Sequence, residues 1–188
     1  MTEKKKKNEL WEWTKVLLIA FGLAALIRYL LFTPIVVDGE SMMPTLEDGD
    51  RMIVNKIGYT IGGPKRFDIV VFHAPERKDY IKRVIGLPGD HVEYRDDQLY
   101  INGEPYDEPY LDEYKAALNG LSEGPLTEDF TLEDKIQRST VPEGHVFVMG
   151  DNRRYSKDSR HIGVIPYDEI IGNTSLIFWP IDDFGLAR

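Results

Sequence analysis

A long apolar segment near the N-terminus most constrains how this chain can fold. Residues 16–32 carry a single charge, Arg28, which lies about a turn from the end of the segment. Helices that span a bilayer contain about 17–25 predominantly apolar residues, so this segment is at the short end of that range. A cationic side chain near a helix end can extend its charge to the lipid headgroups. We therefore predict a transmembrane anchor over residues 16–33.

Two alternatives to an anchor are a cleavable signal peptide and a buried helix of a soluble protein. A signal peptide has a short apolar core followed by a cleavage site with small residues. Here the basic region is long, the apolar run exceeds a typical core, and the bulky residues 30–34 (LLFTP) follow it. The signal-peptide interpretation is therefore the weaker one, and the buried helix remains the plainest alternative.

The lysines before the apolar segment predict its orientation. Residues 4–7 are all lysine, and Lys15 follows them. Short segments rich in Lys and Arg stay on the cytoplasmic side of a membrane. Residues 1–15 are thus expected to form a cytoplasmic tail, and residues 34–188 are expected to lie beyond the outer face of the cell membrane.

Composition limits the functions that remain. The 188 residues suffice for one globular domain plus an anchor, and a net charge of −9 disfavours general nucleic-acid binding. The absence of cysteine excludes disulfides, thiol nucleophiles and Cys-ligated zinc. We expect no nucleic-acid partner, no metal site and no cofactor.

After Pro34 the sequence changes to short runs with high strand propensity, bounded by Gly, Pro and Asp. Weak helical patterns occur only at residues 113–118 and 132–137, so the fold class is predicted as mainly β. Residues 103–140 are polar and form an excursion from the core sheet, either as a subdomain or as a mobile flap. The predicted strands lie at residues 51–56, 68–73, 80–85, 91–94, 98–101, 145–149 and 174–179.

A serine lies in a turn soon after the apolar segment, in the sequence GESMMPTL (39–46). A serine hydroxyl is a weak nucleophile and needs a neighbouring base. The Gly-x-Ser-x-Gly turn of α/β-hydrolases does not fit, because Met43 occupies its last position. The histidines are interpreted as surface or strand-end residues, since none has the sequence context of a catalytic triad. They are His73, His91, His145 and His161.

A lysine offers a different base, in the segment YIKRVIGLPGD (80–90). In a strand, Tyr80, Lys82 and Val84 share one face. If that face is buried, desolvation lowers the lysine pKa, by up to about 3–5 units, and a neutral amine could accept the proton of Ser41. The commoner arrangement is a lysine stem lying on the sheet with its charge in water.

These two segments and a third, GDNRRYSKDSR (150–160), occur in an order that resembles bacterial type I signal peptidases. The resemblance, which is to the compact single-anchor form, implies a β-rich Ser–Lys protease domain with Ser41 as nucleophile and Lys82 as general base. It further implies that Ser156 orients the lysine amine and that Asp158 and Arg160 support the site as a charge pair.

The same resemblance implies the substrate and the location. Signal peptides of exported preproteins would be cleaved at the bilayer, with the secretion machinery as a candidate partner. Some family members have a serine two residues before the nucleophile that helps hold the oxyanion, whereas this chain has Gly39. The backbone N–H of Ser41 would then be the main donor. Residues that match family positions in the substrate pockets, with core packing as the alternative for each, are Val37, Met42, Leu46, Tyr80 and Ile81.

Two rival functions remain open at this point. A self-cleaving Ser–Lys transcriptional repressor shares the β-rich catalytic core but would need a basic helix-turn-helix domain, where this chain has an apolar segment. A membrane-tethered β-rich binding module would have no activity, and substitution of Ser41 would not affect it.

Overall fold

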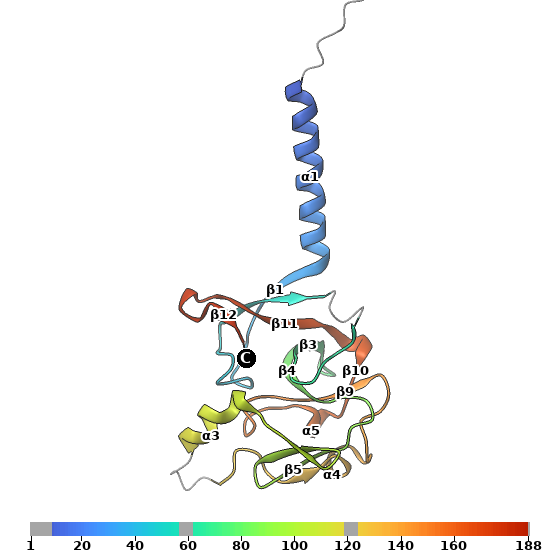
Figure 1. The fold of residues 1–188 in the computed structure, drawn as a ribbon, viewed down its shortest axis with the longest axis vertical. Coiled ribbons are helices and arrows are strands. Elements are labelled where there is room, and N and C mark those ends of the chain that lie inside the picture. The colour runs from blue at the N-terminus through green and yellow to red at the C-terminus, as the bar shows by residue number, and fades with distance from the viewer. Residues whose placement is uncertain (1–8, 57–61, 119–123, 188) are drawn as a thin grey trace, which may run out of the picture.

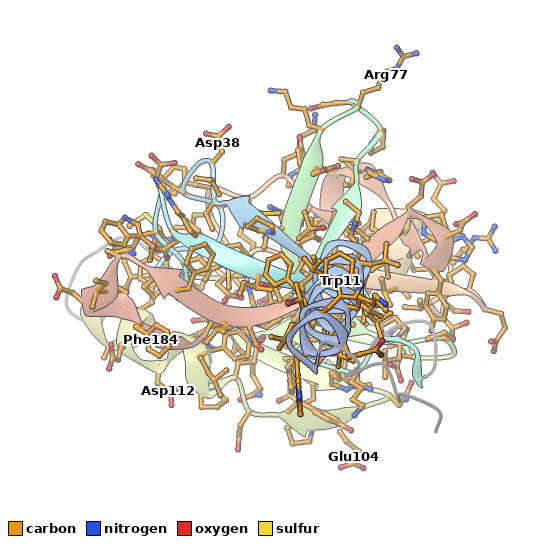
Figure 2. All side chains as sticks on the ribbon, turned by 90° about the horizontal axis from the view of Figure 1, so that it is seen from above. Trp11, Asp38, Arg77, Glu104, Asp112 and Phe184 are labelled. Carbon is orange, nitrogen blue, oxygen red and sulfur yellow. The ribbon has the colours of Figure 1, made fainter. Side chains whose placement is uncertain are left out.

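The computed structural model describes residues 9–56, 62–118 and 124–187. Figure 1 shows one long helix, α1 (Glu9–Leu31), projecting from a β-rich body. In Figure 2, viewed from above, Trp11 lies over the body, whereas Asp38 lies at its periphery. The mainly β fold predicted from the sequence is therefore confirmed for the part of the chain after α1.

Helix α1 differs from the predicted anchor at both ends. It begins within the predicted tail, and it ends at Leu31 because the next residues form strand β1 (Phe32–Val36). Pro34 explains the change, since proline lacks an N–H and disfavours a helical conformation in the preceding residue.

None of the helices in the described ranges is both long enough and apolar enough to cross a membrane. The spanning helix predicted over residues 16–33 is therefore not found among the described residues. Within that range side chains are described for residues 16–26 and 31–33, and those of residues 27–30 lie outside the described part.

The larger sheet carries the predicted catalytic segments. Its strand order is β1-β2-β11-β3-β4-β9-β10, with β12 beside β11, and all of these pairs are antiparallel. Apolar residues alternate along some of these strands and are continuous along others. These patterns explain why the strands are buried on the face that packs against the core. The remaining strands of this sheet are β2 (Arg51–Asn55), β3 (Ile69–His73), β4 (Asp79–Gly86), β9 (His145–Met149), β10 (Ile165–Pro166), β11 (Ile170–Trp179) and β12 (Gly185–Leu186).

A second sheet, in the order β7-β6-β5-β8, takes in part of the predicted excursion, namely strands β7 and β8. It begins before residue 103, because β5 and β6 pair with each other and then with β8 and β7. Its strands are β5 (Val92–Arg95), β6 (Gln98–Ile101), β7 (Glu104–Tyr106) and β8 (Phe130–Thr131).

The two sheets share one apolar cluster, in which Tyr94, Leu99 and Phe130 of the second sheet meet Phe147 and Met149 of β9. Phe130 and Leu132 of the excursion are buried in this cluster. The short helices of the body are η1 (Pro109–Leu111), α3 (Asp112–Leu118), α4 (Leu132–Ile136), α5 (Ser159–Ile162), η2 (Tyr167–Glu169) and η3 (Ile181–Asp183).

Candidate active site

Ser41 lies in a tight turn between β1 and β2, which we call the nucleophile turn (residues 39–45). The turn begins at Gly39, whose φ of +94° is in the left-handed region that favours glycine. Its N–H donates to the Asp48 carboxylate at 2.8 Å. This geometry explains why glycine, rather than serine, occupies the position two residues before Ser41.

Lys82 reaches the nucleophile turn from the middle of β4. Its Nζ lies 2.7 Å from Oγ of Ser41 and donates to the carbonyl oxygen of Ile81 at 2.8 Å. The side chain is buried, with 3% of the residue exposed. A serine hydroxyl at hydrogen-bond distance from a buried amine is the arrangement that nucleophilic catalysis without histidine requires.

Burial also sets the protonation state of Lys82. Desolvation of the ammonium lowers the pKa of Lys82 to about 8, and the negative charges of Asp158 and Asp151 oppose part of that effect. A lysine with that pKa is neutral in about one molecule in ten at pH 7, far more often than an ordinary lysine, and the neutral amine can accept a proton.

The segment after β9 packs directly against the nucleophile turn. Asn152 donates its backbone N–H to the carbonyl oxygen of Ser41 and its side-chain amide to that of Glu40, at 3.2 and 3.0 Å. Gly150 has no room for a side chain, because a Cβ atom there would lie 2.3 Å from the carbonyl oxygen of Ser41. These contacts bring the first and third sequence segments together.

Ser156 does not make the contact predicted for it. The resemblance implied a hydrogen bond from Ser156 to the amine of Lys82, but the described residues contain no such bond, and the buried Oγ of Ser156 has no hydrogen-bond partner among them. The amine is instead held by the carbonyl oxygen of Ile81. The hydroxyl packs against Gly150, where an added Cβ would lie 2.2 Å from it.

Asp158 and Arg160 form the predicted charge pair. The guanidinium of Arg160 donates to both carboxylate oxygens of Asp158, at 2.8 and 2.7 Å. The carboxylate also accepts the backbone N–H of Gly150 and that of Arg160 at the start of α5. Burial opposes ionisation of Asp158, but the pairing with Arg160 outweighs it and holds the pKa of this carboxyl below its usual value.

A pocket of about 340 Å³ opens beside Ser41 and Lys82. Its walls are residues 36–42, which follow β1, and residues 78–82 at the start of β4. Four of the five predicted substrate-binding residues line it, namely Val37, Met42, Tyr80 and Ile81. Leu46 is fully buried and lies in the core cluster with Val37, Met42 and Met52.

Other candidate groups lie elsewhere in the described chain. None of the four histidines lines this pocket, and His73 pairs with the Asp79 carboxylate at 2.7 Å on the surface. No group of three or more potential ligands among the described residues could hold a metal ion.

A buried ion pair next to the catalytic residues was not predicted from the sequence. Arg83 follows Lys82 in β4, and its guanidinium donates to both oxygens of Asp151, at 2.9 and 2.6 Å. Asp151 in turn accepts the hydroxyl of Thr45 at 2.6 Å. The sequence shows only that the lysine segment carries Arg83 and that the third segment carries Asp151. Sequence alone does not show that these two side chains form an ion pair.

Comparisons with known proteins agree with this geometry. Residues 10–179 match a family model described as signal peptidase, peptidase S26. The chain is 48% identical to signal peptidase I of Bacillus caldolyticus over 182 residues, covering 97% of this chain and 96% of that protein. It is 44% identical to signal peptidase IB of Staphylococcus aureus over 182 residues, covering 95% and 94% of the two chains.

A solved structure is also similar. The crystal structure of a signal peptidase I from Enterococcus faecalis superposes with a TM-score of 0.55 at 47% sequence identity. The match covers 60% of this chain and 97% of that one.

Proposed function

The chain belongs to the signal peptidase family, peptidase S26, and from that premise we propose that Ser41 and Lys82 are the catalytic pair of a serine endopeptidase that removes signal peptides from exported preproteins. The observation that carries the proposal is the distance of 2.7 Å between Oγ of Ser41 and the buried amine of Lys82.

The chemistry follows from that contact. The neutral amine of Lys82 accepts the hydroxyl proton as Ser41 attacks the carbonyl carbon of the residue before the cut. Lys82 then gives this proton to the leaving amine, and an acyl-enzyme remains on Ser41. A water molecule that loses its proton to Lys82 hydrolyses the ester and restores the free hydroxyl.

The oxyanion of the tetrahedral intermediate needs donors that are already in place. The backbone N–H of Ser41 is suited to this role, because Gly39 contributes no hydroxyl. Asn152 supports the donor by holding the carbonyl oxygens of Glu40 and Ser41 on the other side of the turn.

The pocket suits an extended peptide with small side chains. Segments 37–41 and 78–82 form its two walls, and an extended peptide lying between them could add backbone hydrogen bonds to either edge. Val37, Met42, Tyr80 and Ile81 would contact the residues before the cut, which the family resemblance expects to be small. Leu46 would act from the core, by supporting Val37 and Met42 from beneath.

We also propose that the N-terminal segment attaches the enzyme to the cell membrane. The side chains of α1 are exposed over residues 11–26, and most of those after Lys15 are apolar. The preceding lysines favour a cytoplasmic tail over residues 1–15. Residues 16–33 would then anchor the chain once, and residues 34–188 would work on the outer face, where signal peptides in the bilayer and the secretion machinery are the partners.

The rival functions have less support. A transcriptional repressor would require a helix-turn-helix domain, and the described N-terminal part is the single helix α1. A binding module without activity would not require a buried lysine beside a serine.

Cleavage of a purified preprotein by the full-length chain tests the proposal. Ser41→Ala and Lys82→Ala should each lower kcat by about 10⁴-fold or more. Lys82→Arg should fail as completely, because a guanidinium stays protonated and cannot act as a base.

Lys78→Ala is the matched control, because Lys78 lines the same pocket without contacting Ser41. This variant should keep kcat within a few-fold. Turnover by Lys82→Arg near the wild-type rate would exclude the Ser–Lys assignment.

A further inference from the structure

The second sheet and the segment after its strand β7 contribute side chains that are buried against the catalytic segments. Glu108 precedes the short helix η1, and Tyr110 lies within it. Both belong to the polar excursion, to which the catalytic mechanism assigns no role. The Glu108 side chain is only 2% exposed, although a carboxylate on a polar surface segment would ordinarily be solvated.

Glu108 binds Arg153, which lies just beyond Asp151 and Asn152. The guanidinium of Arg153 donates to the Glu108 carboxylate at 2.5 Å and to the hydroxyl of Tyr94 at 2.6 Å. Its Nε donates to the carbonyl oxygen of Gly150 at 3.1 Å. These bonds tie the catalytic segment after β9 to the second sheet.

Tyr110 adds a second connection: its hydroxyl donates to Glu108 at 2.6 Å and accepts from Arg153 at 3.3 Å, and its ring faces Arg83. Its ring lies 3.8 Å from the guanidinium carbon of Arg83, which is close for a cation–π contact. Arg83 binds Asp151 with two nitrogens, and Asp151 accepts the hydroxyl of Thr45 at the end of the nucleophile turn. The contacts therefore run from Tyr110 through Arg83 and Asp151 to Thr45.

The nucleophile turn is thus held at two points. Asn152 fixes the carbonyl oxygens of Glu40 and Ser41, and Asp151 fixes Thr45. A third contact reaches Asn152 from the same excursion, because the hydroxyl of Tyr114 in α3 lies 3.4 Å from its side-chain oxygen. Each of these holding points is braced from the segment after β7, where Tyr110 lies in η1 and Tyr114 in α3.

We propose that Tyr110 and Glu108 are positioning residues, which set the place of Ser41 relative to Lys82 by orienting Arg83 and Arg153. Neither touches the substrate or the reacting atoms. The inference rests on the proposed function of Ser41 and Lys82 and adds to it a role for the second sheet. Arg83 adjoins Lys82 in β4, so the same contact also limits the movement of the strand that carries the base.

Tyr110→Leu tests the inference, because leucine keeps apolar volume but loses the aromatic face. The full-length chain should lose about 10- to 100-fold in kcat, since small displacements of reacting groups are costly. KM should change by less than about twofold, because the residue does not contact the pocket. Tyr110→Phe keeps the face that contacts Arg83 and loses only the hydroxyl bonds to Glu108 and Arg153, so it should bring kcat back toward the wild-type value while lowering the melting temperature.

Tyr106→Leu is the matched control. The ring of Tyr106 lies 5.0 Å from the guanidinium of Arg66, which pairs with Asp90 at 2.9 Å. The arrangement of tyrosine, arginine and aspartate is the same, but Asp90 has no bond to the nucleophile turn. Tyr106→Leu should leave kcat unchanged, although it also removes an aromatic ring from an arginine that pairs with an aspartate. Equal losses of kcat in both variants, or full activity in Tyr110→Leu, would overturn the inference.

Two further measurements separate this inference from the proposed function. Loss of turnover in Ser41→Ala tests the function, whereas the distance between Oγ of Ser41 and Nζ of Lys82 in a crystal structure of Tyr110→Leu tests positioning without turnover. We expect that distance to exceed the 2.7 Å of the wild type. If Tyr110→Leu does not fold, Tyr110→Met, whose flexible side chain can fill the space without an aromatic face, replaces it under the same readouts. An unchanged distance would contradict the inference.

Discussion

At the scale of single residues, the site depends on a lysine whose burial and charged neighbours act in opposite directions. Burial lowers the pKa of Lys82, while the carboxylates of Asp158 and Asp151 favour its ammonium form. The first effect is larger, and the pKa falls to about 8. A less buried lysine would stay protonated and could not activate Ser41.

This balance predicts the pH dependence of cleavage. Because the neutral amine is the active form, kcat/KM should rise with pH and level off above about pH 8. Below that pKa it should fall about tenfold per pH unit. Asp158→Asn removes a charge that raises the pKa, so the remaining activity should have its acid limb at lower pH. An acid limb that vanishes when one histidine is replaced would contradict the assignment of Lys82.

Gly150 gives a steric prediction. An added methyl group would lie 2.3 Å from the carbonyl oxygen of Ser41 and 2.2 Å from Oγ of Ser156, so the segment after β9 would have to move away from the nucleophile turn. Gly150→Ala should reduce kcat by about 10²-fold or more.

Gly62→Ala is the control for Gly150→Ala, because no atom lies within 4 Å of the added group at that exposed position. It should cleave at the wild-type rate in the same assay. Comparable rates for the two variants would show that the close approach at Gly150 is unimportant.

The sequence predicted some of these residues better than others. Strand alternation placed Lys82 on a face that could be buried, and the family resemblance paired it with Ser41. Neither of these signals predicted that the carbonyl oxygen of Ile81 would accept a hydrogen bond from the Lys82 amine, because the acceptor is a backbone atom rather than a side chain. The contact expected of Ser156 failed because its hydroxyl points toward Gly150, which only the packing of two distant segments determines.

At the scale of elements, the second sheet is joined to the first through buried charges as well as apolar side chains. Burial raises the energy of the Glu108 carboxylate, but the charge and hydrogen bonds of Arg153 outweigh this and hold its pKa below the usual value. A group with a lowered pKa stabilises the fold at neutral pH and loses that contribution as the pH falls through its folded pKa.

Glu108→Gln should therefore destabilise the protein strongly. It leaves the buried guanidinium of Arg153 without its counter-charge, which costs about 3–5 kcal/mol. Urea unfolding at neutral pH measures the loss.

Glu93→Gln is the matched control, because Glu93 pairs with Arg95 at 2.9 Å on the surface. Exposed pairs contribute about 0–1 kcal/mol. If the two variants unfold at the same urea concentration, the buried pair does not hold the sheets together.

Element prediction succeeded where local pattern decides structure. The strands expected at residues 51–56, 68–73 and 145–149 all form, because each is a short run of apolar and β-branched residues. Strands β8, β10 and β12 were missed, since each is only two residues long and is defined by its partner strand. The excursion has a polar sequence pattern because its buried residues are few and lie far apart in the sequence.

At the scale of the whole molecule, exposed apolar side chains occur along α1 and, on the body, where the C-terminal end of β11 meets η3 and β12. Where β11 pairs with β2, its alternation is interrupted by two irregularities, between Thr174 and Leu176 and between Ile177 and Trp179. As a result Ile177 is buried while Trp179 is 48% exposed, although simple alternation predicts that both share one face. The exposed residues, which we call the C-terminal apolar patch, are Trp179, Ile181, Phe184 and Leu186.

We expect the C-terminal apolar patch to rest on the membrane surface, because indole rings favour the bilayer interface and exposed apolar patches mark interaction surfaces. Figure 2 shows Phe184 at the margin of the body, away from the α1 helix. A chain that begins at Phe32 keeps β1 intact and retains Trp179 as its single tryptophan. Its fluorescence should shift to shorter wavelength when vesicles of zwitterionic lipid are added.

Asp182 and Asp183 lie within η3, beside the patch. Binding should therefore weaken on anionic vesicles at low salt and recover as salt screens the repulsion. The double variant Ile181→Ser, Phe184→Ser retains Trp179 and should lose most of the binding, whereas Tyr155→Ser, which removes an exposed aromatic residue beside the active-site pocket, serves as the control. The absence of both binding and a spectral shift at any lipid concentration would leave the N-terminal segment as the sole contact with the membrane.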